Sequence, residues 1–302
     1  MMAAMQIGPT LIVDTFAEAF RMRYARLIVT AIDDYWREAA TRELCGYGSS
    51  VIQCDAEIAV ERTLSADESP DGRPAAAVLA FGFSSDGLAT ALPMRVGQCV
   101  MTCPTTAVYD GLSESDERVA LGKHLRFFGD GFQKSKQVGG RRYWRVPVMD
   151  GEFLVEESLG VAKGVAGGNI IVQDVSQQVA LDAARLGVEA VAPMAGVITP
   201  FPGGVVRSGS KVGSRYKGLV ASTNDAFCPT LRGRVETELV TETQCAYEIV
   251  INGTDESRVA EAMRTSIHAA AGEGVSAISA GNYGGKLGKF HFHLRELVGG
   301  NT

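Results

Sequence analysis

The chain has 302 residues, of which 46% are hydrophobic and 21% are charged, and its formal net charge is −6. At roughly 100–200 residues per domain, this length predicts one large or two medium globular domains, and the composition excludes a disordered chain. The acidic balance argues against a nucleic-acid partner, because neutralising phosphates requires a surplus of Lys and Arg.

No segment is typical of a secretory leader or a membrane span. Residues 1–20 lack a cationic stretch before their short apolar run, and Asp14 and Glu18 follow too soon. The apolar stretch 188–206 is interrupted by prolines and glycines. The six cysteines form no CxxC pair and are expected to be reduced core thiols: Cys45, Cys54, Cys99, Cys103, Cys228 and Cys245. We therefore expect a cytoplasmic protein.

A strand followed by a helix is predicted over residues 27–46 and again over residues 170–187, with Ile170 142 residues after Ile28. Each copy is a β-branched run, a residue suited to cap a helix, an apolar stripe at helical spacing and a glycine. We expect Gly46 and Gly187 to end their helices in the left-handed conformation.

A strand–helix–strand pattern is also duplicated. The expected elements are a strand over 76–83, a helix over 88–96 and a strand over 99–102, matched by a strand over 247–251, a helix over 255–271 and a strand over 275–279. Pro93 should shorten or kink the first of these helices. Cys99 and Cys103 are then expected on one face of a strand.

With one further strand in each half, over 50–54 and 205–206, each half reads β-α-β-β-α-β. This is the split-βαβ or ferredoxin-like pattern. The predicted fold class is therefore α+β, a duplication of a ferredoxin-like unit that gives two lobes. The seam is expected near residue 150, so that the lobes span residues 1–150 and 151–302.

Residues 201–217, FPGGVVRSGSKVGSRYK, form a basic, glycine-rich segment without an acidic residue. The segment is a local positive field in an acidic chain, and its glycines let backbone N–H groups approach an anion. Its order of Ser and Lys differs from that of a phosphate loop, which argues against a nucleotide. An anionic ligand, a subunit contact and a solvated loop are all compatible with it.

Two other glycine-rich segments carry weaker signals. Residues 164–169 precede a strand, which is the wrong order for a dinucleotide site and indicates tight backbone packing. Residues 281–289 follow the last predicted strand and carry Asn282 and Tyr283, so they either line the same cleft or form a surface loop. Long irregular stretches such as 207–243 favour binding surfaces.

The histidines do not indicate catalysis or a metal site. His291 and His293 alternate with apolar residues, as on the solvent face of a half-buried strand. No zinc-ligand spacing and no nucleophile elbow in a strand–turn–helix setting is present. Metal hydrolysis and serine acyl-enzyme chemistry are therefore not indicated.

Glu248 is the carboxylate that stands out, in the predicted strand AYEIVIN over 246–252. If its face of the strand is covered, desolvation raises its pKa and makes it a proton donor near neutrality. If that face is open to water, Glu248 is an ordinary surface carboxylate. The sequence alone leaves both alternatives open.

Eight sequence motifs in the chain carry a resemblance to a known family: DTFAEAF, SPDGRP, VGQCVMT, FFGDG, PFPGGVVRSGSKVGSRYK, CPTL, YEIVING and SAGNYGGKLGK. Together, over residues 12–297, they resemble the formylmethanofuran:tetrahydromethanopterin formyltransferases. The resemblance implies a cytoplasmic homotetramer with two ferredoxin-like lobes per chain and no metal or prosthetic group. It also implies transfer of a formyl group between the amine of methanofuran and N5 of tetrahydromethanopterin.

The resemblance places the catalytic carboxylate at Glu248, which as a neutral acid would donate a hydrogen bond to the developing oxyanion. Acyl transfer between two nitrogens through a tetrahedral intermediate needs aligned substrates and an oxyanion donor, and no protein nucleophile. Both carriers are anionic, which fits the basic segment. The expected substrate-binding residues are Arg207, Ser208, Lys211, Arg215, Lys217, Asn282 and Lys286.

The moderate acidity and the Ala- and Arg-rich stretches fit a bacterial member. That would imply formaldehyde oxidation to formate and membership of a formyltransferase/hydrolase complex. A non-catalytic carrier-binding or assembly subunit is the alternative, against which Glu248 beside the basic segment argues. A folate-type formyltransferase would need an Asn, His and Asp set on a doubly wound sheet, and neither is visible. No membrane partner is expected.

Overall fold

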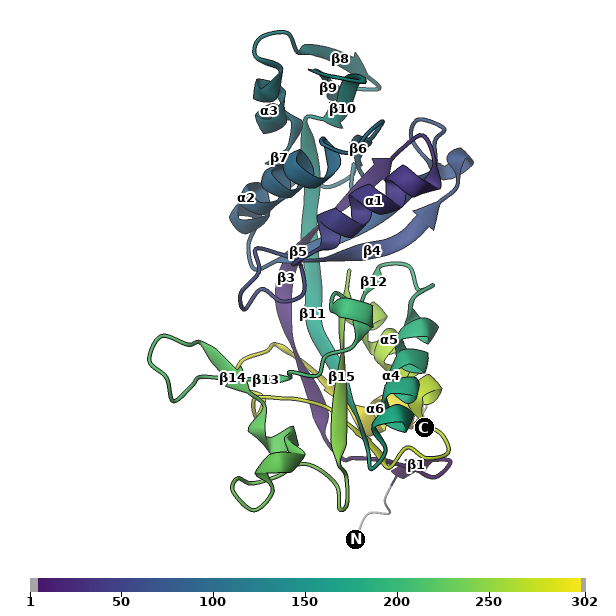
Figure 1. Cartoon of the computed structure of the whole chain (residues 1–302), viewed down its shortest axis with the longest axis vertical. Helices are drawn as coiled ribbons and strands as arrows, with labels where there is room; N and C mark the ends of the chain where they lie inside the picture. Colours follow the sequence, from purple (N-terminus) through teal and green to yellow (C-terminus); the bar gives the residue numbers. More distant parts are fainter. Residues whose placement is uncertain (1–4, 300–302) are drawn as a thin grey trace. The chain divides into compact units, whose positions relative to one another are not determined.

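The computed structural model describes residues 5–299, which form two compact units of mixed α+β structure (Figure 1). Residues 22–164 form one of them, called here the continuous unit. Residues 5–21 and 165–299 form the other, called the split unit. Strands β3 (Phe16–Thr30) and β11 (Ser158–Asp174) each contribute residues to both units.

Four antiparallel strands in the order β4–β5–β3–β6 form the centre of the continuous unit. The strands that join β3 are β4 (Glu57–Leu64), β5 (Ala75–Gly82) and β6 (Ala107–Asp110). Helices α1 (Asp34–Cys45) and α2 (Ser85–Arg95) lie on one face of these strands (Figure 1). Their buried Leu44 and Leu92 belong to the same core as Val78 of β5, so the helices cover the apolar face.

The other elements of the continuous unit lie between these strands or extend the sheet beyond β6. They comprise β7 (Arg118–Ala120), α3 (Gly122–Leu125), β8 (Lys134–Val138), β9 (Arg141–Val148), β10 (Gly151–Glu156), a π-helix over Val96–Val100, and 3-10 turns over Ala66–Glu68 and Arg126–Gly129. Strand β10 runs parallel to β6 and antiparallel to β9. Because β9 also pairs with β8, these three strands continue the ladder.

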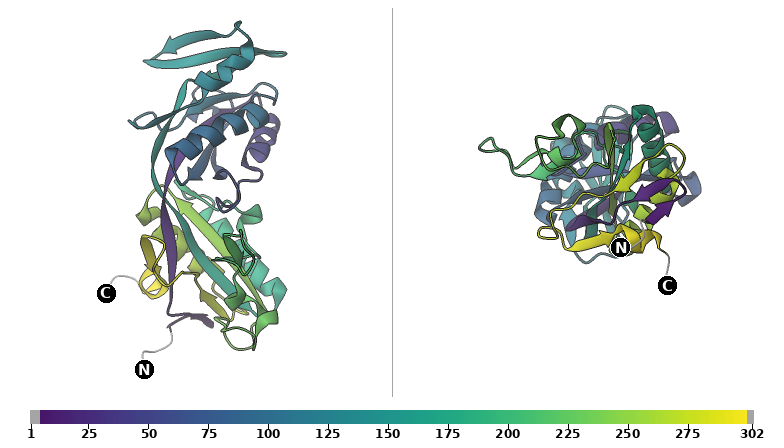
Figure 2. Two further views of the ribbon diagram at one scale, coloured as in Figure 1. Left: turned by 90° about the vertical axis from the view of Figure 1, so that its left-hand side faces the viewer. Right: turned by 90° about the horizontal axis from the view of Figure 1, so that it is seen from below.

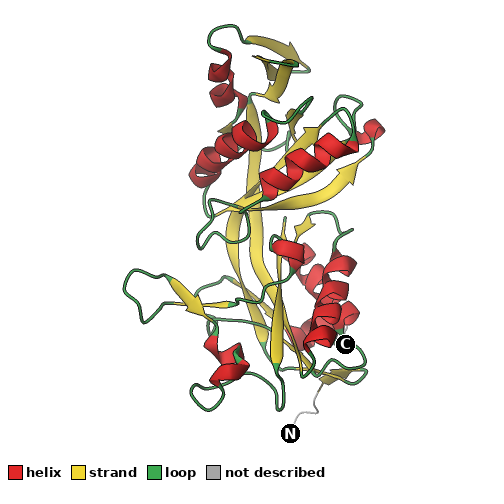
Figure 3. Ribbon diagram, in the orientation of Figure 1, coloured by secondary structure: helices red, strands yellow, loops and turns green. Residues whose placement is uncertain are grey.

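The split unit has the corresponding order β12–β15–β11–β16, again antiparallel. Its central strands beside β11 are β12 (Val197–Ile198), β15 (Cys245–Gly253) and β16 (Ala277–Ser279). Helices α4 (Gln177–Val191) and α5 (Glu256–Ala270), red in Figure 3, lie next to each other against β15. They begin at capping residues Ser176 and Asp255, as the sequence predicts.

The remaining elements of the split unit are short. They are β1 (Met5–Ile7), β2 (Thr10–Ile12), β13 (Ser210–Val212), β14 (Ala221–Thr223), β17 (Phe290–His293), α6 (Leu294–Val298), and 3-10 turns over Pro202–Gly204, Asp225–Phe227 and Pro229–Leu231. The β13–β14 hairpin projects from the body of its unit (Figure 2).

Side chains along β15 alternate between a face that packs against the helices and the opposite face of the sheet. Tyr247, Ile249 and Ile251 are buried in the core with α4 and α5, whereas Glu248 and Val250 point to the other face and are only partly buried. That other face is covered at Glu248 by the irregular segment that follows β12, because Gly209, Asn224 and Phe227 line a pocket with Glu248. Glu248 therefore sits on a covered, helix-free face.

Several sequence predictions need correction. Gly187 does not end its helix: α4 continues to Val191, and a Cβ on Gly187 would lie 2.7 Å from Ser266 Oγ on α5. The glycine thus serves close packing of helices. Gly46 does follow α1, but its φ is −56°, outside the left-handed region.

The strands predicted over 50–54 and 99–102 are also absent. Residues 51–55 form turns and bends, and the strand begins later, at Glu57. After Pro93 the helix continues as the π-helix Val96–Val100, so Cys99 and Cys103 lie on consecutive turns. An apolar spacing of four fits a helical turn as well as a strand face, which explains the error.

The boundary near residue 150 falls at the turn between β9 and β10, and its use as a domain seam stays a prediction. The six cysteines are free thiols, each partly rather than fully buried. No helix in the described part of the chain has both the length and the apolarity to cross a bilayer.

Candidate active site

Glu248 occupies the middle of a three-strand row in the split unit. On one side it stands opposite Ile171 of β11, and on the other it forms an antiparallel bridge with Val206. In that bridge Val206 N–H donates to the Glu248 carbonyl (2.7 Å), and Glu248 N–H donates to the Val206 carbonyl (2.9 Å). Backbone pairing on both sides fixes where the carboxyl group points.

A pocket of about 40 Å³ surrounds the carboxyl group. It is lined by Ile171, Val206, Arg207, Gly209, Thr223, Asn224, Phe227, Cys228, Ala246 and Glu248. A Cβ on Gly209 would lie 3.1 Å from Glu248 Oε2, so glycine at this position lets the basic segment lie against the carboxyl. The volume is enough for a few water-sized atoms, which matches a small reacting group.

The Glu248 carboxyl has no hydrogen-bond or ion-pair partner among residues 5–299. Burial raises its pKa to about 7. The neutral carboxylic acid is therefore populated near neutral pH. A neutral acid without a protein partner is available to donate a hydrogen bond or a proton to a bound group.

Of the basic segment, Arg207 lines the Glu248 pocket, and Ser208 lies next to it on the surface. Both side chains are exposed and make no hydrogen bond within the described chain. Lys211 on β13 instead forms an ion pair with Asp225. Arg215 and Lys217 lie exposed in the turn of the β13–β14 hairpin.

The 281–289 segment folds back onto β3. The Asn282 side-chain amide donates to Thr15 Oγ1 (3.2 Å) and to the Phe16 carbonyl (3.1 Å), and its Oδ1 accepts from Gly284 N–H (3.0 Å). Asn282 thus braces this segment. Lys286 is exposed to solvent.

Tyr247 lies outside the pocket, and the two histidines of β17 lie where the sequence predicts. Tyr247 points away from the pocket into the core, where its hydroxyl accepts a hydrogen bond from Gln177 Nε2 (2.8 Å). His291 and His293 lie on the exposed face of β17, and Phe292 between them is buried. Among the described residues no group of His, Cys, Asp and Glu has the arrangement of a metal site.

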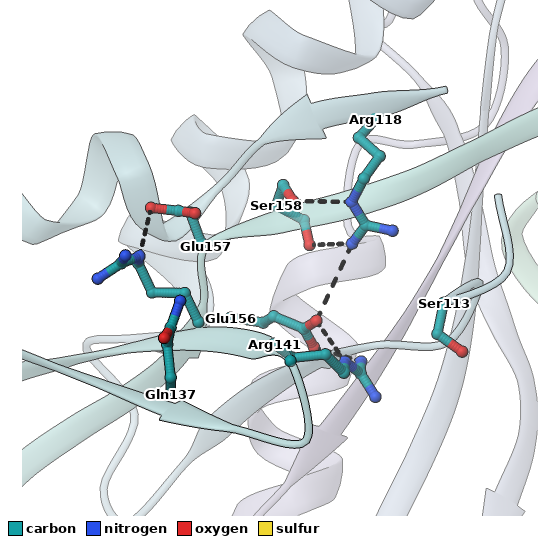
Figure 4. A pocket seen from close by; sticks show the side chains of 9 residues that line it. Ser113, Arg118, Gln137, Arg141, Glu156, Glu157 and Ser158 are labelled. Atoms are coloured by element: carbon teal, nitrogen blue, oxygen red, sulfur yellow. Dashed lines mark hydrogen bonds and ion pairs between the residues drawn. The ribbon is translucent and has the colours of Figure 1, made fainter. Parts of the chain in front are cut away.

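A larger pocket of about 370 Å³ lies in the continuous unit (Figure 4). Arg118 bonds to Asp110 (2.7 Å) and to Ser158, Arg141 bonds to buried Glu156, and Arg142 pairs with Glu157 (3.5 Å). Each guanidinium therefore already faces a carboxylate, and the charges cancel within the cluster. We interpret it as a structural ion-pair network.

Two family models match the chain. The model of formylmethanofuran-tetrahydromethanopterin formyltransferase matches residues 5–148, and the model of the proximal lobe of the same family matches residues 151–297. The chain belongs to this formyltransferase family. It is a transferase, and the family's proximal lobe is the half that contains Glu248.

Individual formyltransferases agree along nearly the whole chain. The enzyme of Methylococcus capsulatus is 54% identical, over 94% of this chain and 97% of its own. The solved formyltransferase of Methanosarcina barkeri is 47% identical with a TM-score of 0.91, and the match covers 97% of this chain and 100% of that chain. A formyltransferase/hydrolase complex from Methylorubrum extorquens was solved with methylofuran. It contains a chain that is 46% identical with a TM-score of 0.94, and the match covers 98% of this chain and 99% of that chain.

Sequence reasoning missed Thr223, Asn224 and Phe227 in the Glu248 pocket. These residues belong to the long irregular stretch 207–243, whose length was a signal for binding surface but singled out no position. Asn224 reaches the pocket because its N–H donates to the Gly209 carbonyl (2.7 Å). That bond extends the β13–β14 pairing, and such pairing between distant positions cannot be read from local sequence.

Proposed function

We propose that this formyltransferase moves a formyl group between N5 of tetrahydromethanopterin and the amine of methanofuran or a close furan analogue. The observation that carries the proposal is Glu248: a carboxyl with a pKa of about 7, without a protein partner, in a pocket that the basic segment closes. The names of the formyltransferase relatives supply the carriers. In this proposal the carriers are substrates, with no resident cofactor or metal.

The reaction begins when the acceptor nitrogen attacks the formyl carbon. A C–N bond forms, and the carbonyl oxygen becomes an oxyanion in a tetrahedral intermediate. Neutral Glu248 donates a hydrogen bond to that oxygen as charge develops, and it then supplies the proton that the departing nitrogen needs when the old C–N bond breaks. The proton lost by the attacking nitrogen restores the acid. No covalent intermediate on the protein is required.

Anionic groups of the carriers would bind along the basic segment. Arg207 and Ser208 are free and adjacent to the Glu248 pocket, so they are the first contacts in this proposal. Lys211 would act from its pair with Asp225, and Asn282 would act by shaping the 281–289 segment. Arg215, Lys217 and Lys286 are exposed on flanking segments and would hold the longer anionic tails.

We further propose a homotetramer. The β13–β14 hairpin exposes four large apolar side chains, a density that a free surface seldom carries: Val212, Tyr216, Leu219 and Val220. A neighbouring copy covering this hairpin would bury them and bring Arg215 and Lys217 to a site on that copy. The pocket of about 40 Å³ in one chain is also too small for two carriers.

The ferredoxin-like duplication is part of the same proposal. It is supported by the strand order, since β4–β5–β3–β6 and β12–β15–β11–β16 occupy equivalent places when each unit is read as β-α-β-β-α-β. We keep residues 1–150 and 151–302 as the two lobes, with family-model limits at 148 and 151 in support.

Membership of a formyltransferase/hydrolase complex, and thus formaldehyde oxidation to formate, is proposed from the likeness to the complex of Methylorubrum extorquens. Six free thiols fit a reducing compartment, so we propose the cytoplasm.

An assay with the purified full chain tests the activity. Formylmethanofuran and tetrahydromethanopterin are mixed with the chain, and the N5-formyl product is followed by mass spectrometry. Binding of both carriers without transfer would favour a non-catalytic carrier-binding subunit.

A further inference from the structure

Glu18 is a buried carboxylate that the transfer mechanism does not use. It lies on β3 in the split unit and is 1% exposed. Its Oε2 accepts hydrogen bonds from the N–H groups of Tyr283 (2.7 Å) and Gly285 (2.8 Å). Its Oε1 accepts from those of Leu287 (2.6 Å) and Gly288. One side chain thus gathers four backbone donors of a single segment.

The four donors also determine the charge state of Glu18. Burial alone would raise its pKa, but the N–H groups of Gly288, Tyr283, Leu287 and Gly285 outweigh burial and hold the pKa below its ordinary value. An ionised carboxylate accepts on both oxygens, which a neutral amide cannot do. The segment over 281–289 is therefore folded around a negative charge.

Glycines make this wrapping possible. Gly284 and Gly285 have φ values of 70° and 71°, in the left-handed region. A Cβ on Gly288 would lie 2.5 Å from the Ala19 carbonyl oxygen and 2.7 Å from Glu18 Cγ. No other residue fits at position 288 unless the segment moves away from β3.

The 281–289 segment begins near the row of paired residues that contains Glu248. Ser279 at the end of β16 stands opposite Ile171, and Ile171 stands opposite Glu248, so the three residues form one row on one face. Adjacent strands are about 5 Å apart, which places Ser279, two residues before the segment, about 10 Å from Glu248. Asn169 on the same face ties the segment down, because its Oδ1 accepts from Gly281 N–H (2.6 Å).

The side chain of Tyr283 lies near enough to both carboxylates to sense their charges. Its ring contacts Phe20, with centroids 6.0 Å apart. Burial, and then the charges of Glu248 and Glu18, raise the pKa of its phenol. The phenol therefore lies within electrostatic reach of Glu248.

We propose that Glu18 is a positioning residue for formyl transfer: it holds the 281–289 segment, and with it Tyr283, as a wall beside the Glu248 pocket that limits the access of water to it. The kinetic part of this inference rests on the proposed function. The structural part does not, since it concerns the segment and the protonation of Glu248 alone.

Two variants of the full chain test it. Glu18→Gln keeps the size of the side chain but turns an N–H₂ toward two backbone donors, and Gly288→Ala keeps the charge of Glu18 but displaces the segment. Asp174→Asn is the matched control, because Asp174 is a buried carboxylate of the same unit that accepts from Ser176 and Ser276, away from the segment.

Hydrogen exchange measures the first expectation. The amides of residues 283–288 should exchange at least tenfold faster in both variants than in the wild type, and at the wild-type rate in Asp174→Asn. Titration of Glu248 by isotope-edited infrared spectroscopy, assigned by difference from Glu248→Gln, measures the second: its pKa should fall from about 7 toward 4.5 as water enters. Unchanged exchange, or faster exchange with an unchanged Glu248 pKa in Gly288→Ala, would overturn the proposal.

Kinetics give the third measurement, provided the wild type transfers formyl groups. Both variants should lose about tenfold or more in kcat with a smaller change in KM, since a misplaced wall impairs the transition state more than carrier binding. If the wild type is inactive, the proposed function fails, and the exchange and titration results still decide the role of Glu18. Full kcat in an active Gly288→Ala variant whose segment is displaced would overturn the positioning role.

Discussion

Glu18 and Glu248 lie in the same unit and differ in what their surroundings offer the charged form. Glu18 is wrapped by four backbone N–H groups and stays ionised, with a lowered pKa. Glu248 is set under the basic segment without a protein donor, so burial raises its pKa to about 7. Hydrogen-bond donors, more than depth, thus decide which carboxylate builds the site and which one carries a proton.

The largest effect should come from removing the proton of Glu248. Glu248→Gln keeps the volume and an N–H donor but cannot exchange a proton, so kcat should fall about 10²-fold or more while KM for both carriers is nearly unchanged. Steady-state kinetics on both carriers measure this. A variant with full kcat would show that positioning alone accounts for the rate.

The same substitution that lowers kcat should raise the stability of the folded chain at high pH. A folded-state pKa of about 7 against an ordinary 4.5 means that the folded chain binds the proton more tightly, so its stability is greatest at low pH and falls as pH rises from about 4.5 through 7. At about 1.4 kcal/mol per pKa unit, Glu248→Gln should stabilise the chain at pH 8 by up to about 3 kcal/mol. Denaturant unfolding at pH 5 and pH 8 measures the difference, which should shrink to below about 1 kcal/mol at pH 5, where the folded chain is protonated and the unfolded chain only partly ionised.

The rate should follow the same proton. In the proposed mechanism the neutral acid is the active form, so kcat should decline above an apparent pKa of about 7, and Glu248→Gln should lack this limb. Glu18, with its lowered pKa, should add no limb near neutrality. A kcat that is flat from pH 6 to 9 in the wild type would contradict the acid role.

The contrast between the two carboxylates was only half visible in the sequence. Glu248 could be identified because it interrupts an apolar strand, and helices α1, α4 and α5 follow from capping residues and apolar stripes. Glu18 could not be identified, because its partners lie 265–270 positions away and are backbone groups that any residue would supply. Local sequence patterns therefore predict the helices and strands, whereas contacts between distant positions in the chain determine the surroundings of Glu18 and Glu248.

Binding should show a smaller change. Arg207 borders the Glu248 pocket and is free, so Arg207→Ala should raise KM for the anionic carrier roughly tenfold, or about 1.4 kcal/mol, and leave a tailless analogue almost unaffected. Lys211→Ala should raise KM less, because Lys211 is already paired with Asp225. Equal losses on the anionic carrier and the tailless analogue would show that Arg207 has a structural role.

The smallest effect should come from Tyr247, which neighbours Glu248 in the chain but lies on the opposite face of β15. Its hydroxyl accepts one hydrogen bond, from Gln177 at the start of α4, and its ring belongs to the apolar core. Tyr247→Phe should therefore cost about 0.5–1.5 kcal/mol in unfolding free energy, the net value of one hydrogen bond, and leave kcat within twofold. Thermal unfolding and kinetics on one preparation measure both. A loss in kcat comparable to that of Glu248→Gln would mean that the two faces of β15 are coupled, and that the site extends through the strand into the helical core.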